Sequence, residues 1–291
     1  MPRSRAATRK RAVDRCWTSP IRNAQNEGMT LTAREIYART YDSAPFDWPG
    51  ELEGYRRWAR ETSARPRILE LACGTGRIAI PLADDGAEVT GLDRSPAMIE
   101  VAQKKRPGGN PAWVVADMRF FDLGRRFDLV IIPAHSFQFM TSADDQVAAL
   151  TATCRHLEPG GRLVVHLDRP GPDWQAALPA TPPPPEARSV DSPRLDPATG
   201  LEWRMRSAWA LDLASEVATL HRDWIRTDTD DAVTEVVPED PMEMKIIGRV
   251  EMEHALARAG FRLQAVHGDF AGGPLLAASD GMIFVAAAPG R

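Results

Sequence analysis

The chain has 291 residues, of which 43% are hydrophobic and 26% charged, and its formal net charge is −4. This composition is typical of a globular protein with a sizeable core, and the acidic balance argues against a nucleic-acid-binding protein, which normally has a basic excess. Three widely separated cysteines, Cys16, Cys73 and Cys154, argue against a disulfide framework or a zinc cluster. We therefore expect a cytoplasmic protein with no nucleic-acid partner.

The first 30 residues are basic, with seven Lys and Arg residues against Asp14 and Glu27. No apolar stretch follows them, as a secretory signal would require, and no run reaches the roughly 18 apolar residues of a membrane helix. We expect a disordered tail over residues 1–30, or a start of translation at Met29. An arm that contacts nucleic acid or a membrane surface stays open as the alternative for this segment; for the rest of the chain we expect no membrane partner.

Between residues 67 and 168, runs of β-forming residues alternate with segments of helical spacing. The strands are predicted over 67–73, 88–93, 112–117, 127–133 and 162–167, and the helices over 75–84, 95–105 and 143–156. Continuous apolar strands that alternate with helices are typical of a parallel sheet with both faces covered.

The pattern breaks after residue 168. Nine prolines fall within 169–200, and at this density we expect no regular element there. Segments 201–211, 217–225 and 244–247 then alternate apolar with polar residues, as antiparallel strands do. Two interpretations stay open for them, a small sheet that packs on the main domain and a lid over a ligand pocket.

The C-terminal part returns to the first pattern, with a helix over 248–259 and strands over 261–267 and 282–288. The two strands read as a closing hairpin with one strand antiparallel to the rest. We therefore expect an α/β domain formed by 31–168 and 248–291, with 169–247 as a proline-rich linker and a small antiparallel β insertion after strand five.

A glycine turn follows the first strand in ILELACGTGR. Glycines at the end of a first parallel strand permit a tight turn and let a ligand approach the backbone. Gly74 and Gly76, with Asp93 at the end of the second strand, fit a loose dinucleotide fingerprint, so a nicotinamide-dependent oxidoreductase is a competitor. Glu70 argues against it, because a carboxylate inside this strand repels a diphosphate and favours a cationic ligand such as S-adenosylmethionine.

Taken together, five segments of the chain resemble the motifs of class I S-adenosylmethionine-dependent methyltransferases, in order and at the usual spacing. They are ELACGTGR, GLDRSPAMIEVA, ADMRFFDL, FDLVIIPAHSF and HLEPGGRLVVHL. The resemblance implies a doubly wound, mostly parallel, seven-stranded Rossmann-like sheet and S-adenosyl-L-methionine as the cofactor. The tail and the inserted sheet are similar to those of bacterial small-molecule methyltransferases, which include sugar-amine N-methyltransferases, and a homodimer stays open.

The same resemblance implies a set of cofactor-binding residues. In it Asp93 binds the ribose, Met98 lies near the adenine pocket, and Asp117 with Met118 faces the adenine. An N-terminal helix with a Tyr-Asp pair closes over the cofactor, which IYARTYDSAPFDW supplies. The full set that we expect to bind the cofactor is Tyr41, Glu70, Ala72, Gly74, Thr75, Gly76, Asp93, Arg94, Met98, Asp117, Met118 and Pro133.

His135 is the sharpest catalytic candidate, because it follows the fourth strand at the carboxyl end, which faces the transferred methyl group in this fold. An imidazole could take a proton from a hydroxyl or ammonium acceptor; a pocket-shaping histidine is the alternative. For the acceptor pocket we expect Tyr37, Trp203 and His221, and no metal site is recognisable. We predict methyl transfer to N or O of a small molecule; a non-catalytic cofactor-binding regulator also stays open.

Overall fold

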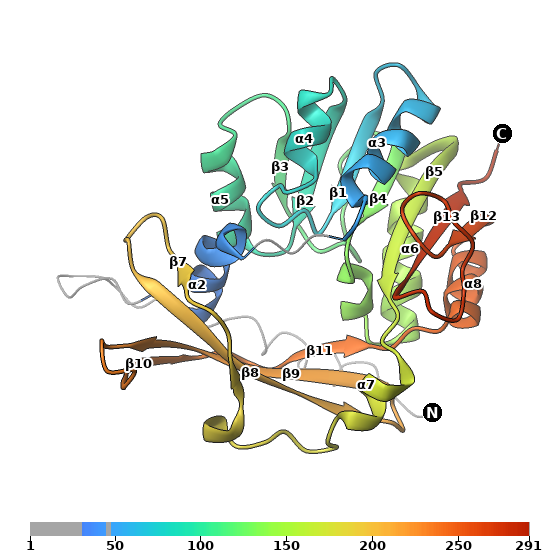
Figure 1. The fold of residues 1–291 in the computed structure, drawn as a ribbon. Coiled ribbons are helices and arrows are strands. Elements are labelled where there is room, and N and C mark those ends of the chain that lie inside the picture. Colours follow the sequence, from blue (N-terminus) through green and yellow to red (C-terminus); the bar gives the residue numbers. More distant parts are fainter. Residues whose placement is uncertain (1–30, 45–47, 291) are drawn as a thin grey trace, which may run out of the picture. The chain divides into compact units, whose positions relative to one another are not determined.

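Seven strands form a mixed sheet, here sheet A, in the order β12-β13-β5-β4-β1-β2-β3 (Figure 1). The computed structural model describes residues 31–44 and 48–290, so the predicted tail over 1–30 lies outside the described residues. The strands are β1 (Arg67–Leu71), β2 (Glu88–Asp93), β3 (Ala112–Val115), β4 (Phe127–Ile132), β5 (Leu157–Asp168), β12 (Arg262–His267) and β13 (Gly281–Ala287).

Strands β1 to β5 pair in parallel, and β13 runs antiparallel to both β5 and β12. The predicted fold class, a mostly parallel sheet closed by an antiparallel hairpin, is confirmed. Several predicted boundaries move. The largest change in a strand of sheet A is that β5 begins at Leu157, so it includes the Pro-Gly-Gly turn that we expected to precede the strand.

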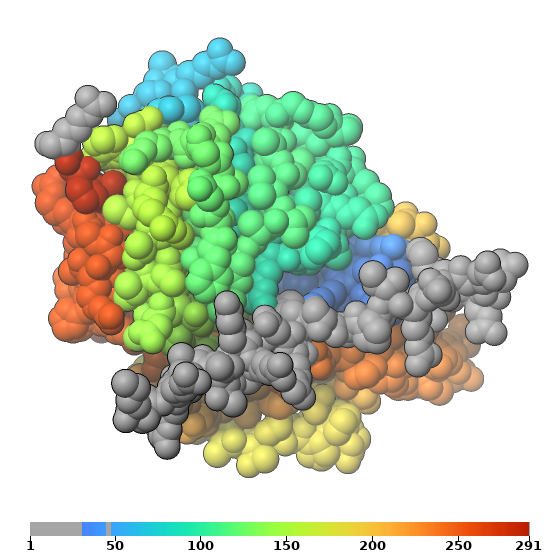
Figure 2. All heavy atoms as spheres, turned by 180° about the vertical axis from the view of Figure 1, so that it is seen from behind, coloured from blue at the N-terminus to red at the C-terminus, as the bar shows by residue number. Residues whose placement is uncertain are grey.

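The core of sheet A has two faces, because successive side chains of a strand point to opposite sides. Ile68, Leu129 and Val164 pack on one face, where they meet buried residues of α3 (Glu51–Thr62) and α4 (Ala79–Asp84). The other face meets α6 (Ala143–Arg155) and α8 (Arg249–Arg258). In Figure 2 the orange residues of α8 lie against the yellow-green residues of α6.

The helix starts follow local chemistry. Ser95 caps α5 (Pro96–Lys105), its hydroxyl accepting the Met98 N–H, and Pro96 takes the first helical position, as predicted. Helix α4 begins at Ala79 and not at Thr75, because Gly76 has a left-handed φ of +83° that no α-helix continues through. The start at Ala79 also puts Pro81 in the first turn, where its missing N–H has no consequence.

Four further elements lie before β1 or between β4 and β5. Helix α2 (Ala33–Thr40) leads into the 3₁₀ turn η2 (Tyr41–Ser43) and matches the N-terminal helix with a Tyr-Asp pair that the resemblance implies. Helix α3 and the 3₁₀ turn η3 (Ser136–Phe139) were not predicted. No helix in the described part of the chain is both long and apolar enough to cross a membrane.

The chain leaves sheet A after β5 and builds a second, antiparallel sheet before it returns with α8. This sheet B contains β6 (Ser189–Val190), β7 (Arg194–Leu195), β8 (Glu202–Asp212), β9 (Val217–Thr227), β10 (Val233–Pro238) and β11 (Met242–Lys245). The predicted insertion is therefore a sheet of its own, with β10 as a strand that the sequence analysis missed.

The expectation of no regular element over 169–200 is wrong. This segment contains α7 (Pro172–Ala177), the 3₁₀ turn η4 (Pro185–Ala187), β6 and β7. The prolines are accommodated because Pro172 and Pro185 each open a helical turn, where proline is tolerated, while the two short strands contain none.

Candidate functional site

The turn after β1 is the centre of the site, because three left-handed residues reverse the chain at the carboxyl edge of sheet A. Ala72, Gly74 and Gly76 have φ of +57°, +54° and +83°. A Cβ added to Gly74 would meet no atom within 4 Å, so this glycine faces open space; one added to Gly76 would lie 2.5 Å from the Trp113 ring. Gly74 therefore suits ligand approach, and Gly76 makes room for the indole.

Asp93, the last residue of β2, holds this turn. Its two carboxylate oxygens accept the N–H groups of Gly74 and Ser95, each at 2.8 Å. Burial raises the pKa of Asp93, and these main-chain hydrogen bonds oppose the increase. The carboxylate lies at the strand end where the ribose is expected, and its two oxygens offer about four acceptor sites, more than the main-chain N–H groups of Gly74, Ser95 and Arg94 occupy.

Glu70 lies in β1 and is 2% exposed. Its Oε2 atom is buried and has no hydrogen-bond partner among the described residues. Burial raises the pKa of Glu70 well above the usual carboxyl range; Arg77 opposes this shift, and Glu51 adds to it. A buried carboxyl oxygen without a donor is costly in a finished structure, so this atom indicates a place for a hydrogen-bond donor or a cation.

Arg77 brings a positive charge to the same place. Its Nη1 donates to Glu51 Oε2 at 2.6 Å, and Glu51 is 1% exposed. Burial raises the pKa of Tyr41 to about 12, with Tyr37 adding to the increase and a hydrogen bond from Arg77 opposing it. Tyr41 is therefore a neutral phenol beside a guanidinium, at the border between the N-terminal segment and the turn.

The N-terminal segment is fastened to the turn by polar contacts. The Thr75 hydroxyl, which is fully buried, donates to Asp42 Oδ1 at 2.8 Å, and Lys105 Nζ donates to Asp42 Oδ2 at 2.9 Å. At the other end of α2, Thr32 and Glu35 form a capping box. The Tyr-Asp pair of the resemblance thus lies directly on the glycine turn.

The predicted adenine side has its own ion pairs. Asp117 accepts three hydrogen bonds from Arg119, the shortest at 2.7 Å, and its Oδ2 lies 3.8 Å from Arg94 Nε. Burial acts to raise the pKa of Asp117, but the bonds from Arg119 outweigh it and the pKa falls. Met98 and Met118 are each 8% exposed. Asp117 therefore also serves the local turn.

His135 lies beyond β4, after Pro133 and the left-handed Ala134 (φ +55°). Its Nδ1 atom lies 2.9 Å from Asp168 Oδ2, and Asp168 is the last residue of β5. The rings of Trp48 and Phe139 approach His135 edge-on, at 6.1 and 5.5 Å between centroids. The predicted catalytic histidine is therefore paired with a carboxylate that the sequence analysis did not name.

The three predicted pocket residues do not all lie together: Tyr37 and Trp203 share one face of sheet B, and His221 is on the other face. The Tyr37 ring lies 6.2 Å from that of Trp224 and beneath the Arg222 guanidinium, 4.3 Å away. The register of β8 with β9 places Trp203 on the same sheet face as Trp224 and His221 on the opposite face. His221 therefore lies away from Tyr37.

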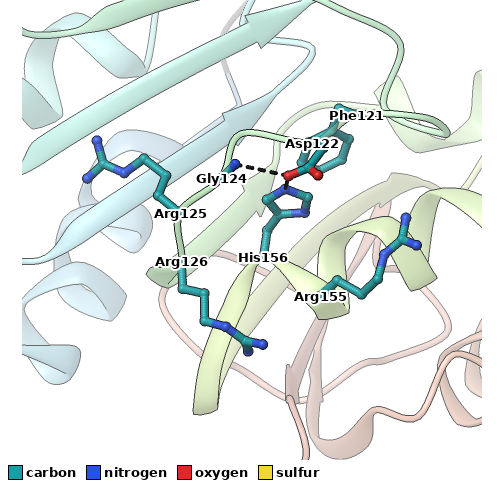
Figure 3. Close-up of a pocket in the computed structure, with 7 residues that line it drawn as sticks. All are labelled: Phe121, Asp122, Gly124, Arg125, Arg126, Arg155 and His156. Carbon is teal, nitrogen blue, oxygen red and sulfur yellow. Dashed lines mark hydrogen bonds and ion pairs between the residues drawn. The ribbon is translucent and has the colours of Figure 1, made fainter.

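A separate hollow of about 410 Å³ lies beside the amino end of β4 (Figure 3), whereas the candidate site lies at the carboxyl ends of the strands. Figure 3 shows that the side chains of Arg125, Arg126 and Arg155 diverge there. Arg125 donates to Glu88, and Arg126 donates to the Leu157 carbonyl. Because the guanidinium groups do not converge, we assign no ligand to this hollow.

The comparisons with known proteins agree with this geometry. The family described as "Methyltransferase domain" matches residues 68–161, which run from β1 into β5. This part of the chain is similar to methyltransferase domains. Two solved structures share the fold of nearly the whole chain: CcbJ of Streptomyces caelestis (TM-score 0.68, 22% identity, 89% of this chain and 98% of that one) and DesVI of Streptomyces venezuelae (0.66, 22%, 90% and 100%). The class I methyltransferase resemblance is confirmed.

Curated relatives of the methyltransferase domain show higher identity over a shorter length. The putative methyltransferase YqeM of Bacillus subtilis is 34% identical over 44% of this chain and 51% of its own. A dTDP-3-amino-3,4,6-trideoxy-alpha-D-glucopyranose N,N-dimethyltransferase of Streptomyces venezuelae is 34% identical over 45% and 55%. The chain spans about half the length of the curated relatives it matches. The match favours a methyltransferase over the oxidoreductase interpretation of the glycine turn.

The sequence analysis missed several residues of the candidate site. Asp168 ends a parallel strand as Asp93 does, so the rule that found Asp93 could have found it. Arg77 directly follows the glycine turn, and its partner Glu51 lies in a helix that was not predicted. For Glu51 no signal was available, because its burial depends on how α3 packs on sheet A.

Proposed function

We propose that this chain is an enzyme that transfers a methyl group from S-adenosyl-L-methionine to a nitrogen or oxygen of a small molecule, with an amine as the favoured acceptor. Glu70 carries the proposal: a buried carboxyl group with an oxygen that lacks a partner among the described residues, beside a glycine turn that opens at Gly74. An anionic diphosphate is a poor ligand for that place, and a cationic nucleoside is a suitable one.

The residues of the carboxyl edge fit this cofactor. When bound, S-adenosylmethionine supplies a methyl group on a positively charged sulfur. Glu70 would accept hydrogen bonds from its ammonium group, and Asp93 would accept those of its ribose hydroxyls. Asp117 and Met118 would border the adenine, with Arg94 beside Asp117.

The remaining predicted residues would shape the walls and the cover of the cofactor site. Ala72 and Pro133 follow β1 and β4 at this edge, and Met98 lies in the first turn of α5. Tyr41 and Thr75 belong to the contact between the N-terminal segment and the turn. This contact would exclude water from the cofactor and hold it for in-line transfer, which can supply much of the rate acceleration.

The acceptor would bind between the carboxyl edge and the face of sheet B that carries Tyr37 and Trp224. Trp203 lies on this face, and its buried Nε1 has no partner among the described residues, so it could donate to an oxygen of the acceptor. Aromatic rings also favour a cationic amine. Two relatives, from Saccharopolyspora spinosa and Streptomyces fradiae, are named as N,N-dimethyltransferases of dTDP-amino sugars, which supports an amine.

The domain boundaries and the surroundings belong to the same proposal. The catalytic domain would comprise 31–168 and 248–291, with 169–247 as the insertion that covers the acceptor. The cysteine usage favours the cytoplasm, and the net charge of −4 gives no reason to expect a nucleic-acid partner. A homodimer is compatible with the proposal.

The proposal is tested by incubating the protein with S-adenosylmethionine and separate panels of amines, phenols and carboxylates, and following the products by mass spectrometry. We expect an amine to gain one or two methyl groups, with S-adenosylhomocysteine formed in equal amount. Cofactor binding without methylation of any acceptor would favour the regulator interpretation.

A further inference from the structure

His135 and Asp168 form a polar pair at the ends of two neighbouring strands. The imidazole Nδ1 and the carboxylate Oδ2 are 2.9 Å apart, and the two side chains are 27% and 26% exposed. Both members of the pair are therefore partly buried and partly exposed.

The pairing determines which ring nitrogen carries the proton. A carboxylate only accepts hydrogen bonds, so Nδ1 of His135 must be the donor. In the neutral imidazole the other nitrogen, Nε2, then has the lone pair that can take up a proton. An amide in place of the carboxylate could present its N–H₂ group and reverse this arrangement.

Asp168 is itself held on its main chain. Gln138, which is fully buried, accepts the Asp168 N–H at 2.7 Å and donates to the Asp168 carbonyl at 3.3 Å. The Gln138 amide also donates to the Lys245 carbonyl at 3.1 Å, at the end of β11. Gln138 thus joins three segments, namely η3, the end of β5 and the end of β11.

The neighbouring titratable groups leave His135 as the base of the cluster. His166, two residues before Asp168 on β5, is buried, and burial lowers its pKa to about 4, with Asp168 opposing and His135 and Arg77 adding to the decrease. It therefore stays neutral near pH 7. The Trp48 ring packs in a T-shaped arrangement against both histidine rings, at 6.1 Å from His135 and 5.0 Å from His166 between centroids.

A second histidine–aspartate pair shows what a structural pair looks like in the same chain. His156 Nδ1 lies 2.7 Å from the Ala152 carbonyl, and its Nε2 accepts the Leu123 N–H at 3.0 Å. Both ring nitrogens are thus used by the main chain, and Asp122, 3.6 Å away, is almost fully exposed (Figure 3).

We propose that Asp168 is the positioning residue that orients His135 to accept the proton which the acceptor loses on methylation; this rests on the proposed function. The acceptor nitrogen or oxygen forms a bond to the methyl carbon, and the carbon–sulfur bond breaks with its electron pair going to sulfur. The proton on the acceptor atom goes to Nε2 of His135 and from there to water. A hydroxyl acceptor gives up this proton as the bond forms, whereas an ammonium acceptor must give it up first, because only the neutral amine has a lone pair for the methyl carbon.

The first test needs no cofactor. Nitrogen-15 NMR of the ring nitrogens should show neutral His135 protonated at Nδ1 in the wild type, and a shift toward Nε2 protonation in Asp168→Asn. Asp122→Asn is the matched control and should leave the His135 signals unchanged. An Nε2-protonated His135 in the wild type would overturn the proposal.

The second test uses turnover. General base catalysis typically contributes roughly 10²–10⁴-fold, so Asp168→Asn should lower kcat by about 100-fold with KM for the cofactor within about twofold. The loss of rate toward acid pH should vanish in His135→Ala, while Asp122→Asn behaves as the wild type. Wild-type kcat and pH profile in Asp168→Asn would contradict the proposal. If no acceptor is methylated at all, the proposed function fails, and the NMR result still decides the role of Asp168.

Discussion

Sheets A and B use polar residues in different ways. The central strands of sheet A are largely apolar, and toward their carboxyl ends Glu70 Oε2 and His166 Nδ1 are buried without a partner among the described residues. Sheet B instead pairs its buried charges: Arg222 donates twice to Glu239, and Arg206 donates twice to Asp223.

This difference separates groups that stabilise the fold from groups that are ready for a ligand. A paired buried charge has its partner in the folded chain, and removing one member leaves the other unsatisfied. A buried polar atom without a partner has a cost that a ligand can remove. Substitutions in sheet B should therefore lower stability, and those at the edge of sheet A should lower affinity.

The largest effect is expected in sheet B. Arg222→Leu leaves Glu239 buried without its partner and should lower the free energy of unfolding by about 3–5 kcal/mol. The double variant Arg222→Leu, Glu239→Gln removes the uncompensated charge and keeps an acceptor for Trp224 Nε1, so it should recover at least half of the loss. Urea unfolding measures both; a single variant within about 1 kcal/mol of wild type would remove the contrast between the sheets.

The two glycines of the turn should separate stability from affinity. Gly76→Ala combines a left-handed φ with a Cβ 2.5 Å from Trp113, and should cost about 2–4 kcal/mol of stability. Gly74→Ala meets no atom and should cost about 1–2 kcal/mol, but its methyl group enters the space expected for the cofactor. Thermal unfolding and calorimetric binding of both variants check this; equal effects on stability would contradict it.

Glu70→Gln should weaken S-adenosylmethionine binding at least tenfold, because a hydrogen bond to a charged group is worth about 1.5–3 kcal/mol. In the ligand-free protein the same substitution should instead be favourable, because it raises the free energy of unfolding. The raised pKa of Glu70 means that the folded chain keeps a proton which the unfolded chain releases above pH of about 4. The free energy of unfolding should therefore fall as pH rises in the wild type, and fall less in Glu70→Gln.

Glu88→Gln serves as the control for this experiment, since Glu88 is exposed at the amino end of β2 and its carboxylate accepts a hydrogen bond from Arg125. It should leave both affinity and the pH dependence unchanged. A Glu70→Gln variant that binds as tightly as wild type would remove Glu70 from the cofactor site.

The smallest effect is expected at the contact between the N-terminal segment and the turn. Thr75→Val keeps the shape of the buried side chain and removes the hydrogen bond to Asp42. A loss of about 1 kcal/mol corresponds to release of the cofactor about fivefold faster, with little change in stability. Stopped-flow displacement of the cofactor measures this rate. Thr62→Val, at the C-terminal end of α3, is the control, because it makes the same chemical change away from the turn.

The sequence predicted sheet A well because its strands are buried on both faces and read as continuous apolar runs. The edge residues that end parallel strands, Asp93 and His135, were found by the same rule. Sheet B was less accessible: β10 was missed because its residues are largely exposed and show no apolar alternation, and the prolines of 169–200 concealed α7 and β6.

Contacts between distant segments could not be predicted either. Trp203 and Trp224 lie in different strands, and only the register of β9 with β8 shows that they share a face, with His221 on the opposite one. The pairing of Glu51 with Arg77 and of Gln138 with Asp168 likewise depends on how α3 and η3 pack against sheet A.

The central claim is that the acidic turn of sheet A binds a cationic nucleoside and not a diphosphate. Calorimetric titration of the wild-type protein with S-adenosylmethionine and with NAD, under the same conditions, tests it most directly. The account predicts saturable binding of S-adenosylmethionine and no binding of NAD. Tighter binding of NAD than of S-adenosylmethionine would contradict it.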